Sequence, residues 1–289
     1  MSLPEHLEIS GHLAFAEGNG GLRKMLVTTP AATAEVYVHG AHVTAFQKTG
    51  EPPLLFMSGS SNFSRSAPIR GGVPVIFPWF GPRDGMPSHG FARTVDWDIL
   101  DTALLPDSSV RLRFGLPAVE YFNVEYLVTI GERLTLELIV RNTSNKDCSF
   151  ESCFHTYFQV SEVEDISVTG LASTGYHDKV TGTNTLETSP AIRIADEVDR
   201  VYFDTTASVA IEDPGHQRRF VIEKSGSRST VVWNPWIEKS AALPDFGDEE
   251  YRQMVCVESG NVGNDKSVLT PGASAAMKVE IRSEPLGRP

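Results

Sequence analysis

The chain has 289 residues, 40% hydrophobic and 21% charged, an ordinary globular balance that argues against a disordered protein. Its net charge of -12 argues against general binding to nucleic acid or to an anionic membrane surface, although a local arginine cluster can still bind an anionic substrate. Three cysteines, an odd and low number, are typical of reduced thiols.

No targeting or membrane segment is expected. The stretch Met1–His6 lacks the basic start and apolar core of a signal peptide. No apolar run approaches the roughly 20 residues that are needed to span a bilayer. We therefore expect a cytoplasmic protein with neither a nucleic-acid nor a membrane partner. Nothing in the sequence demands an oligomer, and we expect a monomer.

Alternation of apolar and polar residues is the dominant pattern along the chain. It is clearest where Leu134, Leu136, Leu138 and Val140 fall on one face. Turn-forming residues separate such segments, which are, in chain order, 35–38, 110–116, 124–130, 133–141, 149–160, 209–212, 219–223, 230–234, 254–258 and 277–281. We find no long amphipathic helix and expect at most a short one over 245–253.

Many strands without a βαβ alternation predict an all-β fold, a large antiparallel sandwich. No composition break divides the chain. We therefore expect a single domain over residues 1–289, with its core from about residue 30 to about residue 283.

Two residues are candidates for acid–base chemistry. His155 lies with Tyr157 on the more polar face of the strand-like run 149–160, opposite Phe154. Glu258 ends another strand-like run, beside apolar neighbours that would raise the pKa of its carboxyl toward that of a useful general base. A half-buried structural histidine and a solvated strand-end glutamate are the alternatives.

Arg70, before Gly71-Gly72, and Arg93, closing a His89-Gly90-Phe91-Ala92-Arg93 segment, are candidate anion ligands. Two guanidinium groups beside glycine turns could bind a phosphate with bidentate hydrogen bonds, since glycine lets the backbone approach a ligand closely. His89 could bind a sugar hydroxyl or cap a turn. Asp199 could accept sugar hydroxyl hydrogens or form a surface salt bridge. The Trp233-Asn234-Pro235-Trp236 segment could stack on a ligand or belong to the core.

The eight histidines show no paired metal-ligand spacing, so we expect no metal. A serine nucleophile elbow is also absent from the sequence.

Together, these segments resemble the aldose 1-epimerase (mutarotase) superfamily, in particular its hexose-6-phosphate branch, the glucose-6-phosphate 1-epimerases. The resemblance runs from about Val36 to about Val279. It rests on the order and spacing of several motifs, namely Arg70-Gly71-Gly72-Val73-Pro74, Phe77-Pro78-Trp79-Phe80-Gly81, His89-Gly90-Phe91-Ala92-Arg93, Phe154-His155-Thr156-Tyr157, Val198-Asp199-Arg200-Val201-Tyr202, Trp233-Asn234-Pro235-Trp236 and Cys256-Val257-Glu258.

The resemblance implies a galactose mutarotase-like antiparallel β-supersandwich, no metal or organic cofactor, and a hexose 6-phosphate substrate. It implies the following roles: His155 as general acid, Glu258 as general base, Arg70 and Arg93 as substrate-binding arginines, Asp199 as a substrate-binding carboxylate and His89 as part of the same site. Sugar-phosphate members often have Gln immediately before the His-Gly-Phe motif, whereas this chain has Ser88. Arg83 is a further candidate for the anion site.

The expected reaction interconverts the α and β anomers of the sugar through its open-chain aldehyde. Three alternatives stay open at this point. An unphosphorylated aldose could be the substrate, or the chain could be a non-catalytic carbohydrate-binding β-sandwich. A glycosidase is also conceivable, but it normally needs two carboxylates flanking the bond, and the sequence offers only Glu258.

Overall fold

The computed structural model describes residues 5–117 and 119–287 and shows an all-β fold in which the paired strands run antiparallel. The predicted fold class is confirmed. Within the described residues no helix is long and apolar enough to cross a membrane.

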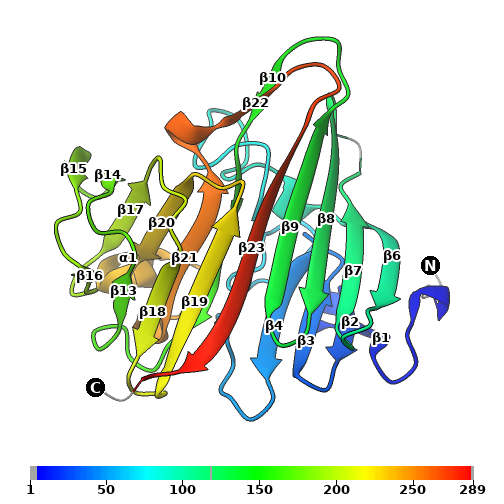
Figure 1. The fold of residues 1–289 in the computed structure, drawn as a ribbon, viewed down its shortest axis with the longest axis horizontal. Helices are drawn as coiled ribbons and strands as arrows, with labels where there is room; N and C mark the ends of the chain where they lie inside the picture. Colours follow the sequence, from blue (N-terminus) through cyan, green and yellow to red (C-terminus); the bar gives the residue numbers. More distant parts are fainter. Residues whose placement is uncertain (1–4, 118, 288–289) are drawn as a thin grey trace.

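A nine-stranded sheet forms one wall of the molecule (Figure 1). Its strands, in spatial order, are β16 (Ala191–Ile192), β13 (Ser167–Thr169), β18 (Val209–Asp213), β19 (Arg218–Ser225), β23 (Ser274–Pro285), β9 (Leu134–Asn142), β8 (Phe122–Ile130), β7 (Val110–Gly115) and β6 (Asp98–Leu104).

An eight-stranded sheet carries the candidate site. Its strands are β15 (Thr183–Leu186), β14 (Gly175–Asp178), β17 (Val198–Tyr202), β20 (Ser229–Asn234), β21 (Met254–Asn261), β11 (Ser152–Phe154) and β5 (Val75–Ile76), and β12 (Tyr157–Gln159) also pairs with β21.

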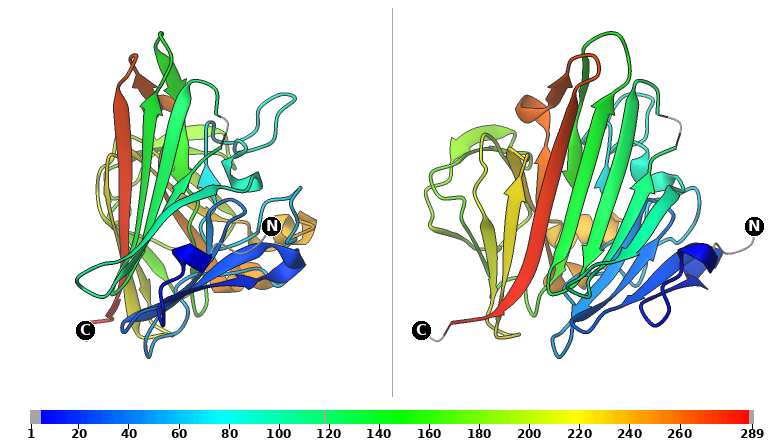
Figure 2. Two further views of the ribbon diagram at one scale, coloured as in Figure 1. Left: turned by 90° about the vertical axis from the view of Figure 1, so that its right-hand side faces the viewer. Right: turned by 45° about the vertical axis from the view of Figure 1, so that its right-hand side comes forward.

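Two smaller sheets and a few short helices complete the fold. One sheet has the strands β1 (Leu13–Glu17), β2 (Arg23–Thr28), β3 (Ala32–Tyr37) and β4 (His42–Lys48), and the other has β10 (Cys148–Phe150) and β22 (Ser267–Leu269). The helices are α1 (Trp236–Ala242) and the 3-10 turns η1 (Glu5–Leu7), η2 (Asn19–Gly21), η3 (Ala92–Thr94), η4 (Glu250–Gln253) and η5 (Gly263–Asp265). Seen edge-on, the long strands of the nine-stranded sheet lie on one side, and β1–β4 and α1 on the other (Figure 2).

The core lies between the sheets, and period-2 alternation selects its members. Along β9 the side chains of Leu134, Leu136, Leu138 and Val140 are buried, as the sequence predicts. We expected the core to start at about residue 30, but it begins earlier, because Leu13 on β1 also belongs to it. By contrast, β21 is buried along its whole length.

Two local predictions were wrong. The run 149–160 is not one strand, because β10, β11 and β12 are separate and His155 and Thr156 lie in the break between β11 and β12. The short helix expected over 245–253 is present only as the 3-10 turn η4, while the α-helix α1 lies earlier. Pro235 precedes α1, and a proline at a helix start costs no backbone hydrogen bond.

Candidate active site

Five of the six predicted site residues lie around one cavity of about 160 Å³ on the eight-stranded sheet. They are Arg70, His89, His155, Asp199 and Glu258, and the cavity is completed by Phe80, Lys179, Val231, Trp233 and Lys239. Strands β17, β20 and β21 are neighbours in this sheet, so residues far apart in the sequence meet there. Arg93, the sixth residue, is not part of the lining.

His155 and Glu258, the candidate acid–base pair, lie at the buried end of the cavity. Nε2 of His155 lies 3.2 Å from Oε1 of Glu258, and the side chains are 10% and 1% exposed. The sequence wrongly placed Glu258 at a strand end, because β21 continues to Asn261 and is covered on both faces. The ring of His155 stacks on Tyr157 with centroids 4.8 Å apart and meets the edge of Trp233. These contacts hold the imidazole opposite the carboxylate.

Burial sets the protonation of this pair. It raises the pKa of Glu258 from its ordinary value of 4.5 to about 8. Burial, together with the nearby His89, Arg93 and Arg70, lowers the pKa of His155 well below its ordinary value. The contact between the two groups acts in the opposite sense, because it favours imidazolium beside carboxylate. Around neutral pH the pair therefore holds one proton, which the two groups share.

His89 stands next to the pair as a neutral ring. Its centroid is 5.8 Å from that of His155, and burial and the charge of Arg93 lower its pKa to about 3. The backbone N–H of Gly81 donates a hydrogen bond to Nδ1 at 3.3 Å, so the proton of the neutral ring belongs on Nε2. His89 thus both fixes a turn, at a positive φ of 65°, and lines the cavity.

Arg70 is already paired. Its Nη2 donates to Oδ1 of Asp245 at 3.0 Å, and its Nη1 donates to the hydroxyl of Tyr157 at 3.2 Å. Burial alone would lower the pKa of Arg70, but Tyr157 and Asp245 hold it above its ordinary value. Arg70 therefore stays charged, and its guanidinium is held rigidly at the cavity wall.

The glycines after Arg70 serve packing against the chain rather than approach to a ligand. Gly71 has a φ of 112°, and a Cβ there would lie 2.5 Å from the carbonyl oxygen of Phe56. Gly72 has a φ of 60°, and a Cβ would lie 2.3 Å from the carbonyl oxygen of Val43. Only glycine fits such close backbone approaches at positive φ. The pair lets the segment after Arg70 run close beside β4, where Val73 pairs with Val43.

Arg93 lies outside the lining. Its Nη2 donates to the carbonyl oxygen of Ser88 at 2.8 Å, and burial lowers its pKa to about 10, so it is charged at neutral pH. Arg83, which we considered for the anion site, instead places its guanidinium 5.0 Å from the ring centroid of Trp79 and is not part of the lining. Ser88 is exposed and likewise contributes no part of the lining.

Two lysines that the sequence did not single out lie on the lining. Nζ of Lys179 is 3.3 Å from Oδ1 of Asp199, and Nζ of Lys239 is 4.0 Å from Oδ2 of the same carboxylate and 2.7 Å from Glu197. Their side chains are 35% and 41% exposed, against 1% for Glu258, so they mark the open end of the cavity. Lys179 follows β14 and Lys239 belongs to α1, neither of which the sequence predicted.

Three metal-capable donors meet at the buried end. Ligand atoms of His155, Cys256 and Glu258 lie within 4.8 Å of one another. However, the cavity is also lined by Arg70, Lys179 and Lys239, and these positive charges favour an anion over a cation. The arrangement is thus better suited to an anionic ligand than to a metal.

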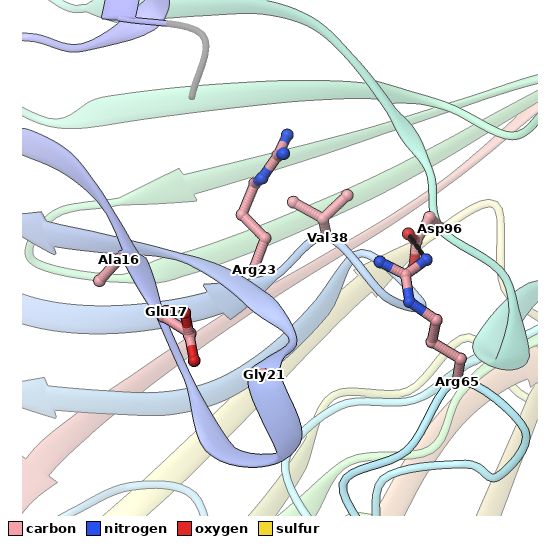
Figure 3. Close-up of a pocket in the computed structure, with 7 residues that line it drawn as sticks. All are labelled: Ala16, Glu17, Gly21, Arg23, Val38, Arg65 and Asp96. Carbon is pink, nitrogen blue, oxygen red and sulfur yellow. Dashed lines mark hydrogen bonds and ion pairs between the residues drawn. The ribbon is translucent and has the colours of Figure 1, made fainter. Parts of the chain in front are cut away.

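Size alone does not locate the site. A larger cavity, of about 460 Å³, opens near the β1–β2 turn, where Arg23 and Arg65 extend from opposite sides of Val38 (Figure 3). Arg65 is paired with Asp96 at 2.7 Å, and Glu17 is the other acid of the lining. No imidazole faces this cavity among its lining residues, so it lacks the acid–base pair that proton transfer needs.

The sequence profile described as "Aldose 1-epimerase" matches residues 23–282. A protein from Cenchrus ciliaris named "Putative glucose-6-phosphate 1-epimerase" is 34% identical over 87% of this chain and 82% of its own length. One of the same name from Escherichia coli strain K12 is 30% identical over 84% of this chain and 85% of its own length. The crystal structure of a "putative mutarotase" from Salmonella typhimurium superposes with a TM-score of 0.88 at 26% identity, covering 96% of this chain and 95% of that one. The matched profile spans both halves of the site, from Arg70 to Glu258, and the chain is a member of the aldose 1-epimerase family.

Proposed function

We propose that this chain is a glucose-6-phosphate 1-epimerase, which interconverts the α and β anomers of a hexose 6-phosphate. The observation that carries the proposal is the buried pair His155–Glu258, 3.2 Å apart, at the end of a cavity whose mouth bears Lys179 and Lys239. The pair supplies an acid and a base, and the lysines supply charge for a phosphate. The relatives that bear the glucose-6-phosphate 1-epimerase name support this substrate.

Opening the sugar ring requires that one proton leave the C1 hydroxyl and that another be added to the ring oxygen O5. The carboxylate of Glu258 takes the proton of the C1 hydroxyl, the C1–O5 bond breaks as the C1 carbonyl forms, and the imidazolium of His155 protonates O5. Rotation about the C1–C2 bond turns the aldehyde, and ring closure on its other face returns both protons. The productive state is therefore the carboxylate–imidazolium form of the single-proton pair. Each positioned proton transfer typically contributes about 10²–10⁴-fold in rate.

The cavity also orients the sugar. Asp199, held by the lysines, offers carboxylate oxygens to sugar hydroxyls, and the Nε2 proton of His89 offers a donor. The edge of Trp233 and Phe80 supply apolar surface for sugar C–H groups. With C1 at the buried pair, the phosphate on C6 would lie toward the open end. There it can keep part of its hydration while it meets Lys179 and Lys239.

The proposal is tested by NMR magnetisation exchange between the anomers of glucose 6-phosphate, with free glucose and galactose measured in parallel. We expect acceleration of the phosphorylated sugar above its spontaneous rate. Glu258→Gln and His155→Ala should each lower this rate by at least about 10²-fold. His12→Ala and Glu137→Gln, which lie away from the cavity, should leave the rate unchanged.

The outcomes separate the remaining readings. Acceleration of free glucose but not of the phosphate would identify an epimerase for unphosphorylated aldoses. No acceleration of any of these sugars would refute the proposal and favour a carbohydrate-binding role. Full activity in both site variants would show that the acid–base assignment is wrong.

A further inference from the structure

The two carboxylate oxygens of Glu258 have different neighbours. Oε1 lies beside Nε2 of His155, whereas Oε2 accepts a hydrogen bond from the thiol of Cys153, whose Sγ is 3.4 Å away. Both Glu258 and Cys153 are buried. Within residues 5–117 and 119–287, this thiol is the one side-chain donor that is hydrogen-bonded to Oε2. Glu258 is thus hydrogen-bonded to the thiol at Oε2, while Oε1 faces His155 and the cavity.

The backbone builds a recess for this thiol. Cys153 on β11 is paired with Gly260 on β21, and Gly260 is two residues beyond Glu258, on the same face of the strand. A Cβ at Gly260 would lie 2.9 Å from both Cβ and Sγ of Cys153. The missing side chain of Gly260 therefore leaves the space that the Cys153 side chain occupies beside the carboxylate.

The chemistry of a buried thiol suits this position. Burial and the neighbouring carboxylate raise the pKa of Cys153 well above its ordinary value, so the sulfur keeps its proton and remains a donor. A thiol is a weak donor, and it can orient a carboxylate without removing much of its basicity. Other charged or titratable groups also act on this pair: Lys179, Asp199 and Arg93 on Glu258, Lys224 of β19 on Cys153, and the adjacent His155 and Cys256.

We propose that Cys153 is a positioning residue for the general base: its thiol holds Oε2 of Glu258, so that Oε1 stays turned toward His155 and the substrate. The kinetic part of this inference rests on the proposed function. The hydrogen bond itself does not, and it can be measured in the protein without substrate.

The test compares Cys153→Ala, which removes the donor, with Cys153→Ser, which keeps one, and with Cys148→Ala, which removes a buried thiol elsewhere. The carboxyl carbon of Glu258 is titrated by ¹³C NMR, with Glu258→Gln to assign its signal. We expect the alanine variant to titrate about 0.5–1 pH unit higher than the parent, because a hydrogen bond to an ionised group favours the ionised form. The serine variant should titrate at least that much below the alanine variant, and Cys148→Ala should match the parent.

Activity on glucose 6-phosphate supplies the second readout. The productive form has an ionised Glu258, so a pKa raised by about 0.5–1 unit should lower kcat/KM at pH 7 by about 3- to 10-fold in Cys153→Ala. Cys153→Ser should recover most of this loss. If alanine prevents folding, Cys153→Val is the donor-free replacement that fills the recess.

Three results are decisive. Coincident titrations for the alanine and serine variants would mean that Cys153 acts only by packing, and the inference would be overturned. An unchanged titration in the alanine variant would overturn it as well. If the NMR titrations separate as expected but the parent accelerates no anomer exchange, the hydrogen bond stands and the proposed function fails.

Discussion

Arg70 and Asp245 form an ion pair at the cavity wall, with Nη2 of the arginine 3.0 Å from Oδ1 of the carboxylate. A phosphate bound by Arg70 would have to share its guanidinium with this carboxylate, whose like charge opposes the approach. The lysines at the open end are also paired, Lys179 with Asp199 at 3.3 Å and Lys239 with Glu197 at 2.7 Å, but their side chains are 35% and 41% exposed, against 18% for Arg70, and are freer to turn toward a phosphate. This relationship shifts the expected phosphate contact from the arginine to the lysines.

Lys179→Ala combined with Lys239→Ala should therefore raise KM for glucose 6-phosphate by about 10- to 100-fold, which corresponds to about 1.4–2.8 kcal/mol. The phosphate would lose two charge-assisted partners and would face an Asp199 no longer neutralised. Steady-state anomer exchange measured on glucose 6-phosphate and on free glucose checks this. Lys146→Ala, an exposed lysine near Tyr121, is the control. An equal loss on both sugars would argue that the lysines only shape the cavity.

Arg93→Ala should mainly raise KM for glucose 6-phosphate and barely affect free glucose. Although burial lowers its pKa to about 10, Arg93 remains charged at pH 7 and adds positive potential near His155 and Glu258. We expect about a tenfold effect, smaller than that of the lysine pair, because Arg93 does not line the cavity. Its hydrogen bond to the carbonyl of Ser88 suggests Arg93→Lys as the matched variant that retains the charge. If that variant is as impaired as alanine, the loop contact rather than the charge is what matters.

The sequence was sufficient to predict the architecture. Alternation such as that of Leu134 to Val140 shows directly which face of a strand is buried. It also singled out His155 and Glu258, from motifs far apart in the chain whose residues meet in the folded sheet. It could not show that Arg70 is matched by Asp245, 175 positions away, since nothing local links them. The sequence did not identify Lys179 and Lys239 as site residues for a similar reason. A lysine in a turn or on an unpredicted short helix is ordinarily a solvated charge.

The pH dependence of kcat/KM should fall on the alkaline side with a midpoint near pH 8. The pair His155–Glu258 holds one proton below this pH, and burial has raised the pKa of Glu258 to about 8, so at higher pH no proton remains for O5. The acid side will include the titration of the substrate phosphate itself, near about pH 6, so the alkaline side is the diagnostic one. The fall should be absent from the residual rate of Glu258→Gln. A wild-type profile that stays flat to pH 9 would contradict the assignment.

Glu258→Gln should stabilise the folded protein, and increasingly so as the pH rises from 5 to 8. An unfolded glutamate ionises near about pH 4.3, whereas folded Glu258 stays protonated up to about pH 8. Between these values folded Glu258 keeps a proton that unfolded Glu258 has lost, so the contribution of this residue to the stability of the wild type falls as the pH rises. Glutamine is nearly isosteric with the protonated acid and does not carry this penalty. We expect about 1 kcal/mol in favour of the variant at pH 5 and about 4–5 kcal/mol at pH 8, measured by urea unfolding. Glu137→Gln on β9 is the control. A difference in unfolding free energy that does not change with pH would mean that folded Glu258 is not protonated in this range. The raised pKa on which its role as general base rests would then be refuted.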